Sequence, residues 1–138
     1  MANGFNPTGV WGPKGRAFSQ GVVQHEGRVI HVTGQVAWDA DHRIVGEGDV
    51  GAQLRKCFEN VEAILAEVGG VLDDIVSQTI YYTDDAQLPQ IQEVRSRHFS
   101  VPTAPVSILI RAAGLVDPGL LVEVVPVAVV PHERFREP

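Results

Sequence analysis

The sequence predicts one α+β domain that spans residues 1–138, built in the order strand-strand-helix-strand-helix-strand-strand. Three observations support this prediction. Short runs rich in β-branched residues alternate with two longer segments whose apolar residues recur at helical spacing. No linker, internal repeat or low-complexity tract separates these segments. The composition, with 44% hydrophobic and 20% charged residues, is typical of a globular domain with a substantial core.

The first half of the chain is expected to form two strands and a helix, after a Gly/Pro-rich arm over residues 1–15. Residues 18–36 contain two β-branched runs joined at the turn dipeptide Glu26-Gly27. Asp49 is a suitable N-cap for a helix that runs to about Val68, where two glycines end it. The apolar residues of this helix share one face, and they are Leu54, Cys57, Phe58, Val61, Ile64, Leu65 and Val68.

The second half is expected to form a strand, a helix and two further strands. Residues 75–83 are β-branched and aromatic, which favours a strand. Asp84 or Asp85 can cap the helix that follows, and two prolines after this helix prevent its continuation. A turn with the sequence VDPG separates the last two strands, 106–114 and 120–130. One face of the second helix carries Leu88, Ile91, Val94 and His98.

Both faces of the last predicted strand are apolar, which has a consequence for assembly. Two amphipathic helices can cover only one face of a sheet. A second apolar face in water would exceed the patches that monomers usually expose. We therefore expect a homo-oligomer whose interface includes the helix-free face. One face carries Leu121, Val125 and Val127, and the other carries Leu120, Val122, Val124 and Ala128.

Charge and hydropathy argue against several classes of partner. The formal net charge is −6, with 11 basic and 17 acidic residues and no basic run, so we expect no nucleic-acid partner. No apolar run approaches the ~20 residues that span a bilayer, so we expect no membrane partner. The N-terminal segment lacks the pattern of a signal peptide, and the chain contains one cysteine. These features predict a cytoplasmic protein.

Three features are better explained by structure than by chemistry. The stretch GEGDVG matches a dinucleotide loop, but Glu47 and Asp49 place carboxylates where the phosphates would bind. Cys57 lies on the apolar stripe of the first helix, so we interpret it as a small core residue. The five histidines show no spacing typical of metal ligands. We expect neither a metal nor another cofactor.

Two positions call for a further explanation. Gly34 follows Thr33 in a predicted strand, where a glycine allows a ligand or another backbone to approach, or marks a bulge. Glu123 is the single charged residue in the apolar stretch GLLVEVVPVAVV. An unpaired buried carboxylate is costly. Glu123 therefore lies at the rim, pairs with Arg111 on the adjacent strand, or has a function.

Together these segments resemble the Rid family, the YjgF-type reactive-intermediate deaminases. The resemblance covers about Phe18–Val130, and its most specific residues are Gly34-Gln35 after a hydroxyl residue, Asn60, and the PGLLVE stretch at Pro118–Glu123. It implies a chorismate-mutase-like fold with a mixed sheet and both helices on one face. It also implies a homotrimer with ligand clefts between subunits. The stretches that carry it are FSQGVVQHEGRVIHVTGQV, AQLRKCFENVEAILAEVGG, DIVSQTIYYTDD and PVSILIRAAGLVDPGLLVEVVPVAV.

The resemblance also implies roles for individual residues. In deaminating members of the family, a cleft arginine binds the substrate carboxylate, and a tyrosine, a hydroxyl and a glutamate position and activate water. Thr33 matches the hydroxyl and Glu123 the glutamate, so both are candidate catalytic residues. Gly34 belongs to the same motif as a ligand-binding residue. Phe18 and Ser107 occupy the tyrosine and arginine positions, so two of the polar groups are missing.

The functional prediction depends on Ser107, which stands where deaminating members of the family have an arginine. A serine cannot supply the charge that binds a carboxylate, so we expect hydrolysis of a small imine, enamine or related metabolite other than the common 2-imino acids. Arg16 or Arg111 could replace the arginine, and Arg16 lies two residues before Phe18. The alternative is a trimer without catalytic activity that binds a small ligand in a regulatory or protective role. In both cases the expected partners are a small molecule and further copies of the chain.

Overall fold

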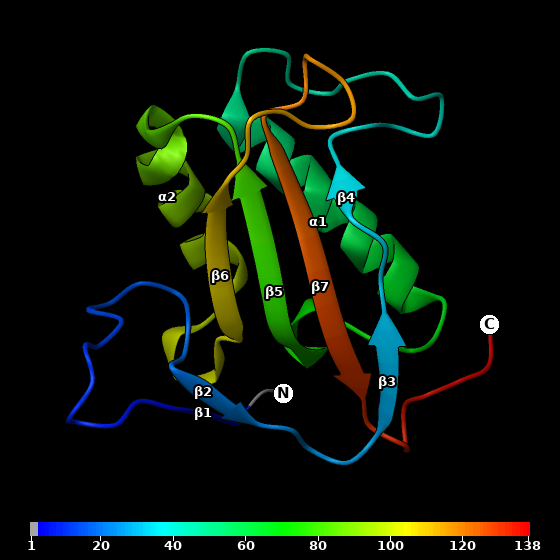
Figure 1. Cartoon of the computed structure of the whole chain (residues 1–138). Coiled ribbons are helices and arrows are strands. Elements are labelled where there is room, and N and C mark those ends of the chain that lie inside the picture. The colour runs from blue at the N-terminus through cyan, green and yellow to red at the C-terminus, as the bar shows by residue number, and fades with distance from the viewer. Residues whose placement is uncertain (1–2) are drawn as a thin grey trace.

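A computed structural model describes residues 3–138 (Figure 1). Its core is a five-stranded sheet with strand order β3-β7-β5-β6, in which the short β4 also pairs with β7. The predicted α+β class is confirmed. The main sheet contains β3 (Arg28–His31), β4 (Gln35–Val36), β5 (Ile75–Tyr82), β6 (Val106–Arg111) and β7 (Val122–Val130). The remaining elements are β1 (Asn3–Phe5), β2 (Gly21–Val23), α1 (Val50–Ala66), α2 (Leu88–His98) and 3-10 turns at Leu72–Asp74, Asp85–Gln87 and Val101–Thr103.

The sheet is mixed, as predicted. The central strand β7 runs antiparallel to β3, β4 and β5, whereas β5 and β6 are parallel. A parallel pair cannot be joined by a tight turn, and α2 lies in the crossover connection between β5 and β6. Both helices lie behind the sheet in Figure 1, and the other face is turned to the viewer.

Helix α1 follows from its cap and its apolar stripe. The Asp49 carboxylate accepts a hydrogen bond from the Ala52 amide at 3.0 Å, as expected for an N-cap. Gly69 has a φ of +79°, a left-handed conformation that favours glycine and ends the helix. Ile64 differs from the prediction, because its side chain is 37% exposed rather than buried. The fully buried members of the stripe are Leu54, Cys57, Phe58, Val61 and Leu65.

The region around α2 differs from the prediction in two ways. Asp84 caps the short 3-10 turn that precedes the helix, and Gln87 occupies the N-cap of α2 itself. Ile91 and Val94 are buried as predicted, but Arg95 is buried with them at 1% exposure. A fully buried arginine is unusual and needs partners.

The N-terminal segment contains a strand that the sequence did not indicate. β1 lies within the predicted arm and pairs with β2 in a separate two-stranded sheet. The two runs joined at Glu26-Gly27 therefore form strands that belong to different sheets. They separate because β3 pairs with β7, a long apolar strand of nine residues, whereas β2 pairs with β1.

The helix-free face of the main sheet is apolar, as predicted. Val29, Ile108 and Ile110 are 45%, 45% and 41% exposed on strands β3 and β6. On the opposite face, Val122 and Val124 of β7 are fully buried against the helices. The chain thus covers one face of its sheet and leaves the other face open.

Candidate active site

Glu123 lies near the start of the central strand β7, on the open face of the sheet. Its register partner on β5 is Tyr81, which alternates with the buried residues Ile80 and Tyr82. Among residues 3–138, the half-buried Glu123 carboxylate makes no hydrogen bond or ion pair. The suggested partner Arg111 instead binds the Asp85 carboxylate at 3.1 Å. The ion-pair explanation for Glu123 is therefore wrong.

Gly34 allows the Glu123 carboxylate to occupy its position. A methyl group at Gly34 would overlap the Oε2 atom of Glu123, and its next nearest neighbours would also belong to that side chain. The glycine thus permits a close approach of a side chain from β7. This observation gives a physical reason for the Thr33-Gly34 pattern, and Gly34 does not have a left-handed conformation. The alternative, a bulge, is present as well, because the four steps from His31 to Gln35 lie opposite only three steps on β7, from Val127 to Val124.

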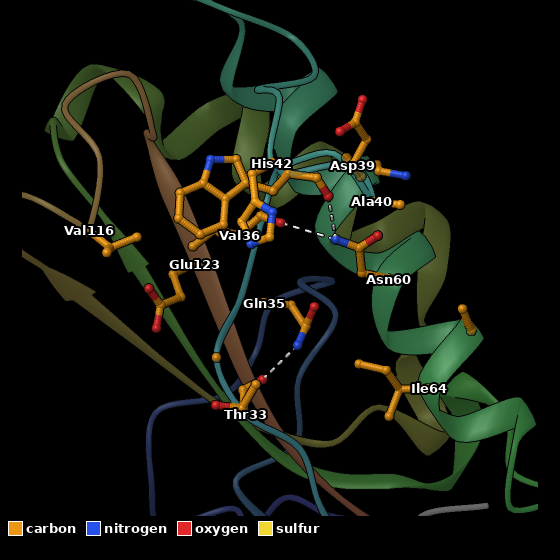
Figure 2. Close-up of a pocket in the computed structure, with 14 residues that line it drawn as sticks. Thr33, Gln35, Val36, Asp39, Ala40, His42, Asn60, Ile64, Val116 and Glu123 are labelled. Atoms are coloured by element: carbon orange, nitrogen blue, oxygen red, sulfur yellow. Dashed lines mark hydrogen bonds between the residues drawn. The ribbon is translucent and has the colours of Figure 1, made fainter.

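Thr33, Gly34 and Glu123 line one pocket of about 720 Å³, which we call the Glu123 pocket (Figure 2). In Figure 2, Glu123 lies on one side of the chain that passes through Thr33, and Asn60 lies on the other. The Asn60 side chain donates hydrogen bonds to the carbonyl oxygens of Val36 and Trp38, both at 3.1 Å. Asn60 therefore ties the chain after Thr33 to helix α1.

Cys57 on α1 is a core residue, as interpreted from the sequence. Its side chain is fully buried, and the nearest hydrogen-bond acceptor is the Val122 carbonyl oxygen at 3.9 Å. Burial, together with the charge of Glu123, raises the pKa of the Cys57 thiol to about 12. The thiol stays protonated at neutral pH, so it cannot serve as a thiolate nucleophile.

The other three predicted residues line a second pocket. Arg16, Phe18 and Ser107 surround a space of about 160 Å³ beneath the N-terminal segment, and we call it the Arg95 pocket after a fourth member. Phe18 is buried and Arg16 is exposed. The Arg16 guanidinium carbon lies 5.4 Å from the centre of the Phe18 ring. The remaining lining residues are Trp11, Gln92, Arg95 and Leu109.

Arg95 is the functional candidate that the sequence interpretation missed. Its Nη1 atom donates a hydrogen bond to the Ser107 hydroxyl at 3.0 Å, and its Nη2 atom donates to the Gln92 side chain. A guanidinium therefore does lie beside Ser107, but it comes from α2. The available signal was helical spacing, because residue 95 is four positions after Ile91 and falls on the buried stripe.

The two pockets lie on opposite faces of the sheet in one chain. Ser107 pairs with Gln78, which is 1% exposed and faces the helices. Glu123 pairs with Tyr81, three positions further along β5 and hence on the other face. The six residues predicted for one site thus form two separate groups within a single chain.

Comparison with known proteins identifies the fold. The sequence model of the family described as Endoribonuclease L-PSP matches residues 13–130. The chain belongs to this family, which is also called the YjgF or Rid family. The Rid family resemblance found in the sequence is therefore confirmed.

Solved structures of Rid proteins agree with this assignment. The Rid protein YyfB from Yersinia pestis, described as a protein of unknown function, is 27% identical, with a TM-score of 0.84 over 94% of this chain and 98% of that chain. A YjgF family member from Mycobacterium tuberculosis is 29% identical, with a TM-score of 0.64 over 86% of this chain and 91% of that chain. The chain therefore has the Rid fold along nearly its whole length.

The described part of the Rid domain offers few features of other site classes. No group of three His, Cys, Asp or Glu side chains within residues 3–138 is arranged to hold a metal ion. No helix in the same range is long and apolar enough to cross a membrane. The predicted site residues lie in the Glu123 and Arg95 pockets.

Proposed function

We propose that this Rid protein hydrolyses a small imine or enamine to a carbonyl compound and ammonia, in clefts between the subunits of a homotrimer. The observation that carries the proposal is the Glu123 carboxylate. It is half-buried in a pocket, lies over a glycine, and has no partner within residues 3–138. A carboxylate held in this way is available to accept a proton from a bound water.

The proposed reaction adds one water across a C=N bond. Glu123 accepts a proton from water as the water oxygen attacks the imine carbon, and the nitrogen takes up a proton from solvent. Glu123 then returns its proton to this nitrogen, the C–N bond breaks, and ammonia leaves. The new hydroxyl becomes a carbonyl and releases its proton to solvent. The exposed Thr33 hydroxyl lines the same pocket and would position the water.

The proposed cleft combines the two pockets from different chains. Within one chain, Ser107 and Glu123 lie on opposite faces of the sheet, so one chain cannot place both groups on the same small ligand. The exposed Ile108 and Ile110 support an interface on the open face. The Arg95 pocket lies beside β6, the strand at one edge of the sheet. A neighbouring subunit that also packs along this edge would bring its Glu123 pocket towards the Arg95 pocket of the first chain.

The shortest 2-imino acids are expected to be poor substrates. Phe18 supplies no hydroxyl, and Ser107 supplies no charge of its own. The guanidinium beside Ser107 belongs to Arg95, which already donates to Ser107 and Gln92. A three-carbon substrate such as 2-iminopropanoate offers little besides its carboxylate for binding. Because Arg95 already has two hydrogen-bond partners, this carboxylate should gain less binding energy from it than from an arginine without such partners.

Ammonia release from a panel of enzymatically generated imines and enamines tests the proposal, with thermal-shift data on the corresponding keto compounds. We expect ammonia release above the uncatalysed rate for at least one compound of more than three carbons. Compounds that raise Tm without any turnover across the panel would contradict hydrolysis and favour the alternative of a non-catalytic, ligand-binding trimer. The buried Phe18 at the tyrosine position is the observation that favours this alternative.

A further inference from the structure

Two guanidinium groups share the Arg95 pocket without a carboxylate. The guanidinium carbons of Arg95 and Arg16 each lie 5.4 Å from the centre of the Phe18 ring. Arg16 donates through Nε to the Pro13 carbonyl oxygen at 2.8 Å, a neutral acceptor. Among the residues that the structure describes, no aspartate or glutamate pairs with either arginine.

The arrangement leaves buried polar atoms unsatisfied. Arg95 is 1% exposed, and its Nε atom has no hydrogen-bond partner within residues 3–138. Gln78, the register neighbour of Ser107, is equally buried, and neither its side-chain oxygen nor its nitrogen has a partner there. Buried groups without partners are costly and mark places where a ligand can supply the missing bonds. Arg95 lines the pocket and Gln78 does not, so the Nε atom of Arg95 is the group that a ligand in this pocket can reach.

The charge of Arg95 favours an anionic ligand. Burial and, to a lesser extent, the nearby Arg16 lower the pKa of Arg95 to about 10, so the guanidinium remains charged at neutral pH. A buried cation that neutral groups alone solvate gains strongly from an anion. The chain carries 17 acidic residues, and within residues 3–138 none of them forms an ion pair with this cation.

We propose that the Arg95 pocket binds the carboxylate of the substrate, with Arg95 from α2 as the principal ligand-binding residue and Arg16 as its second donor. The identity of this ligand as a substrate rests on the proposed hydrolysis, whereas carboxylate binding does not. The Nε and Nη2 atoms of Arg95 form one edge of the guanidinium, and a carboxylate can bind such an edge in a bidentate manner. Gln92 occupies the Nη2 end and must move aside.

The lining of the pocket also indicates the size of the ligand. Trp11 is 65% exposed at the pocket, and its ring is tilted against that of Phe18 with 5.8 Å between the ring centres. Leu109 adds a further apolar group. Because the carboxylate must displace Gln92, a ligand needs further apolar contacts to bind well. The ligand class is therefore a carboxylate with an apolar body larger than that of pyruvate.

Isothermal titration calorimetry on the full chain tests the pocket without any turnover. The probes are 4-methyl-2-oxopentanoate, its neutral amide and pyruvate. We expect the acid to bind at least about 10-fold more tightly than the amide, which is the value of one charged hydrogen bond. Pyruvate should bind more weakly than the larger acid. Equal affinity for the acid and the amide would overturn the proposal.

Four variants assign the effect to residues. Arg95→Met should weaken binding of the acid by about 10- to 100-fold, and Arg16→Gln by a smaller factor. Arg97→Gln, on the exposed face of the same helix, should leave binding unchanged. Gln92→Ala should tighten binding, because it frees the Nη2 atom of Arg95. This gain would not arise if Arg95 had only a structural role.

The outcomes separate this inference from the proposed function. If Arg95→Met folds and binds the acid like the natural protein, the inference is overturned. If Arg95→Met does not fold, an unchanged affinity in both Arg16→Gln and Gln92→Ala overturns it. Binding of the acid with no imine hydrolysis would contradict the proposed function and support the pocket. Hydrolysis of neutral and anionic imines at equal rates would support the proposed function and contradict the role of the pocket in carboxylate binding.

Discussion

Gly34 and Glu123 form a contact whose disruption can be predicted. In Gly34→Ala the added methyl group displaces the Glu123 carboxylate, which is the flexible end of a side chain. We expect little change in Tm but a loss of about 100-fold in kcat, because catalysis depends on position to within about 1 Å. Steady-state ammonia release and thermal unfolding measure the two effects. Gly9→Ala is the control, since no atom lies within 4 Å of a methyl group there. Unchanged kcat in Gly34→Ala would contradict the role of this contact.

Asp74 and Arg134 form the best-shielded ion pair of the described residues. The Asp74 side chain is fully buried, and Arg134 donates to both of its oxygens, at 2.6 and 3.0 Å. Arg134→Met should lower the free energy of unfolding by about 2–3 kcal/mol, because it weakens the neutralisation of a buried carboxylate. Arg97→Met, which breaks an exposed pair with Glu93, should cost at most about 0.5 kcal/mol. Equal losses in urea denaturation would contradict this account.

The same pair predicts a dependence of stability on pH. Burial alone would raise the pKa of Asp74, but the hydrogen bonds from Arg134 and the Val71 amide outweigh it and lower the pKa. The pair therefore makes its full contribution to the free energy of unfolding above the unfolded-state pKa of Asp74, about 3.9. This contribution is lost as pH falls through the lower pKa of Asp74 in the folded state. The stability difference between the natural protein and Arg134→Met should be constant from about pH 5 to 8 and shrink below about pH 4. A constant difference down to pH 2 would contradict the assignment.

At the scale of secondary-structure elements, Asp49 determines where α1 begins. Asp49→Ala removes the acceptor for the Ala52 amide and should lower the free energy of unfolding by about 1 kcal/mol. Asp49→Ser retains a capping oxygen and should keep most of this stability. Urea denaturation of both variants gives the comparison. If Asp49→Ser lowers the free energy of unfolding as much as Asp49→Ala does, the cap does not stabilise the helix.

Most elements were predictable because their signals are local. The spacing from Leu54 to Leu65, with Asp49 before it, determines α1 almost completely. The pairing of β2 with β1 was not predictable, because the arm before Phe18 carries no β-branched run that would indicate a strand. The choice of β7 as partner for β3 depends on contacts between residues about a hundred positions apart.

The candidate site was predictable only in part. The Thr33-Gly34 and Glu123 signals lie in short motifs, and the structure brings these residues into one pocket. Whether they act in catalysis stays a prediction. Arg95 was missed because the predicted apolar face of the second helix included only Leu88, Ile91, Val94 and His98. A charged side chain on a buried stripe becomes visible only when the packing of the helix is known.

At the scale of the whole molecule, the open face predicts assembly. Light scattering at micromolar concentration should give about 45 kDa, three times the chain mass of 14.9 kDa. Ile108→Glu places a charge on the open face and should reduce this mass. Val71→Glu replaces another exposed apolar residue, 51% exposed near the end of α1, and should not. A stable monomer of the natural protein would contradict both the trimer and the cleft.

The charge of the molecule also bears on the ribonuclease description of the family model. With a net charge of −6 and no cluster of basic residues in the sequence, the protein should show no measurable affinity for RNA or DNA. Filter binding at low salt is the most permissive assay, because electrostatic attraction is screened least there. Tight binding under these conditions would contradict the prediction.

The central claim is that Glu123 transfers protons during hydrolysis of a C=N bond. The most direct test compares ammonia release by the natural protein and by Glu123→Gln on the best substrate of the imine panel, with Glu26→Gln as a control. Because an amide cannot take up the proton of water, Glu123→Gln should lower kcat at least about 100-fold. Its Tm and light-scattering mass should match those of the natural protein. Equal rates of ammonia release from the natural protein and a folded, trimeric Glu123→Gln variant would contradict the claim.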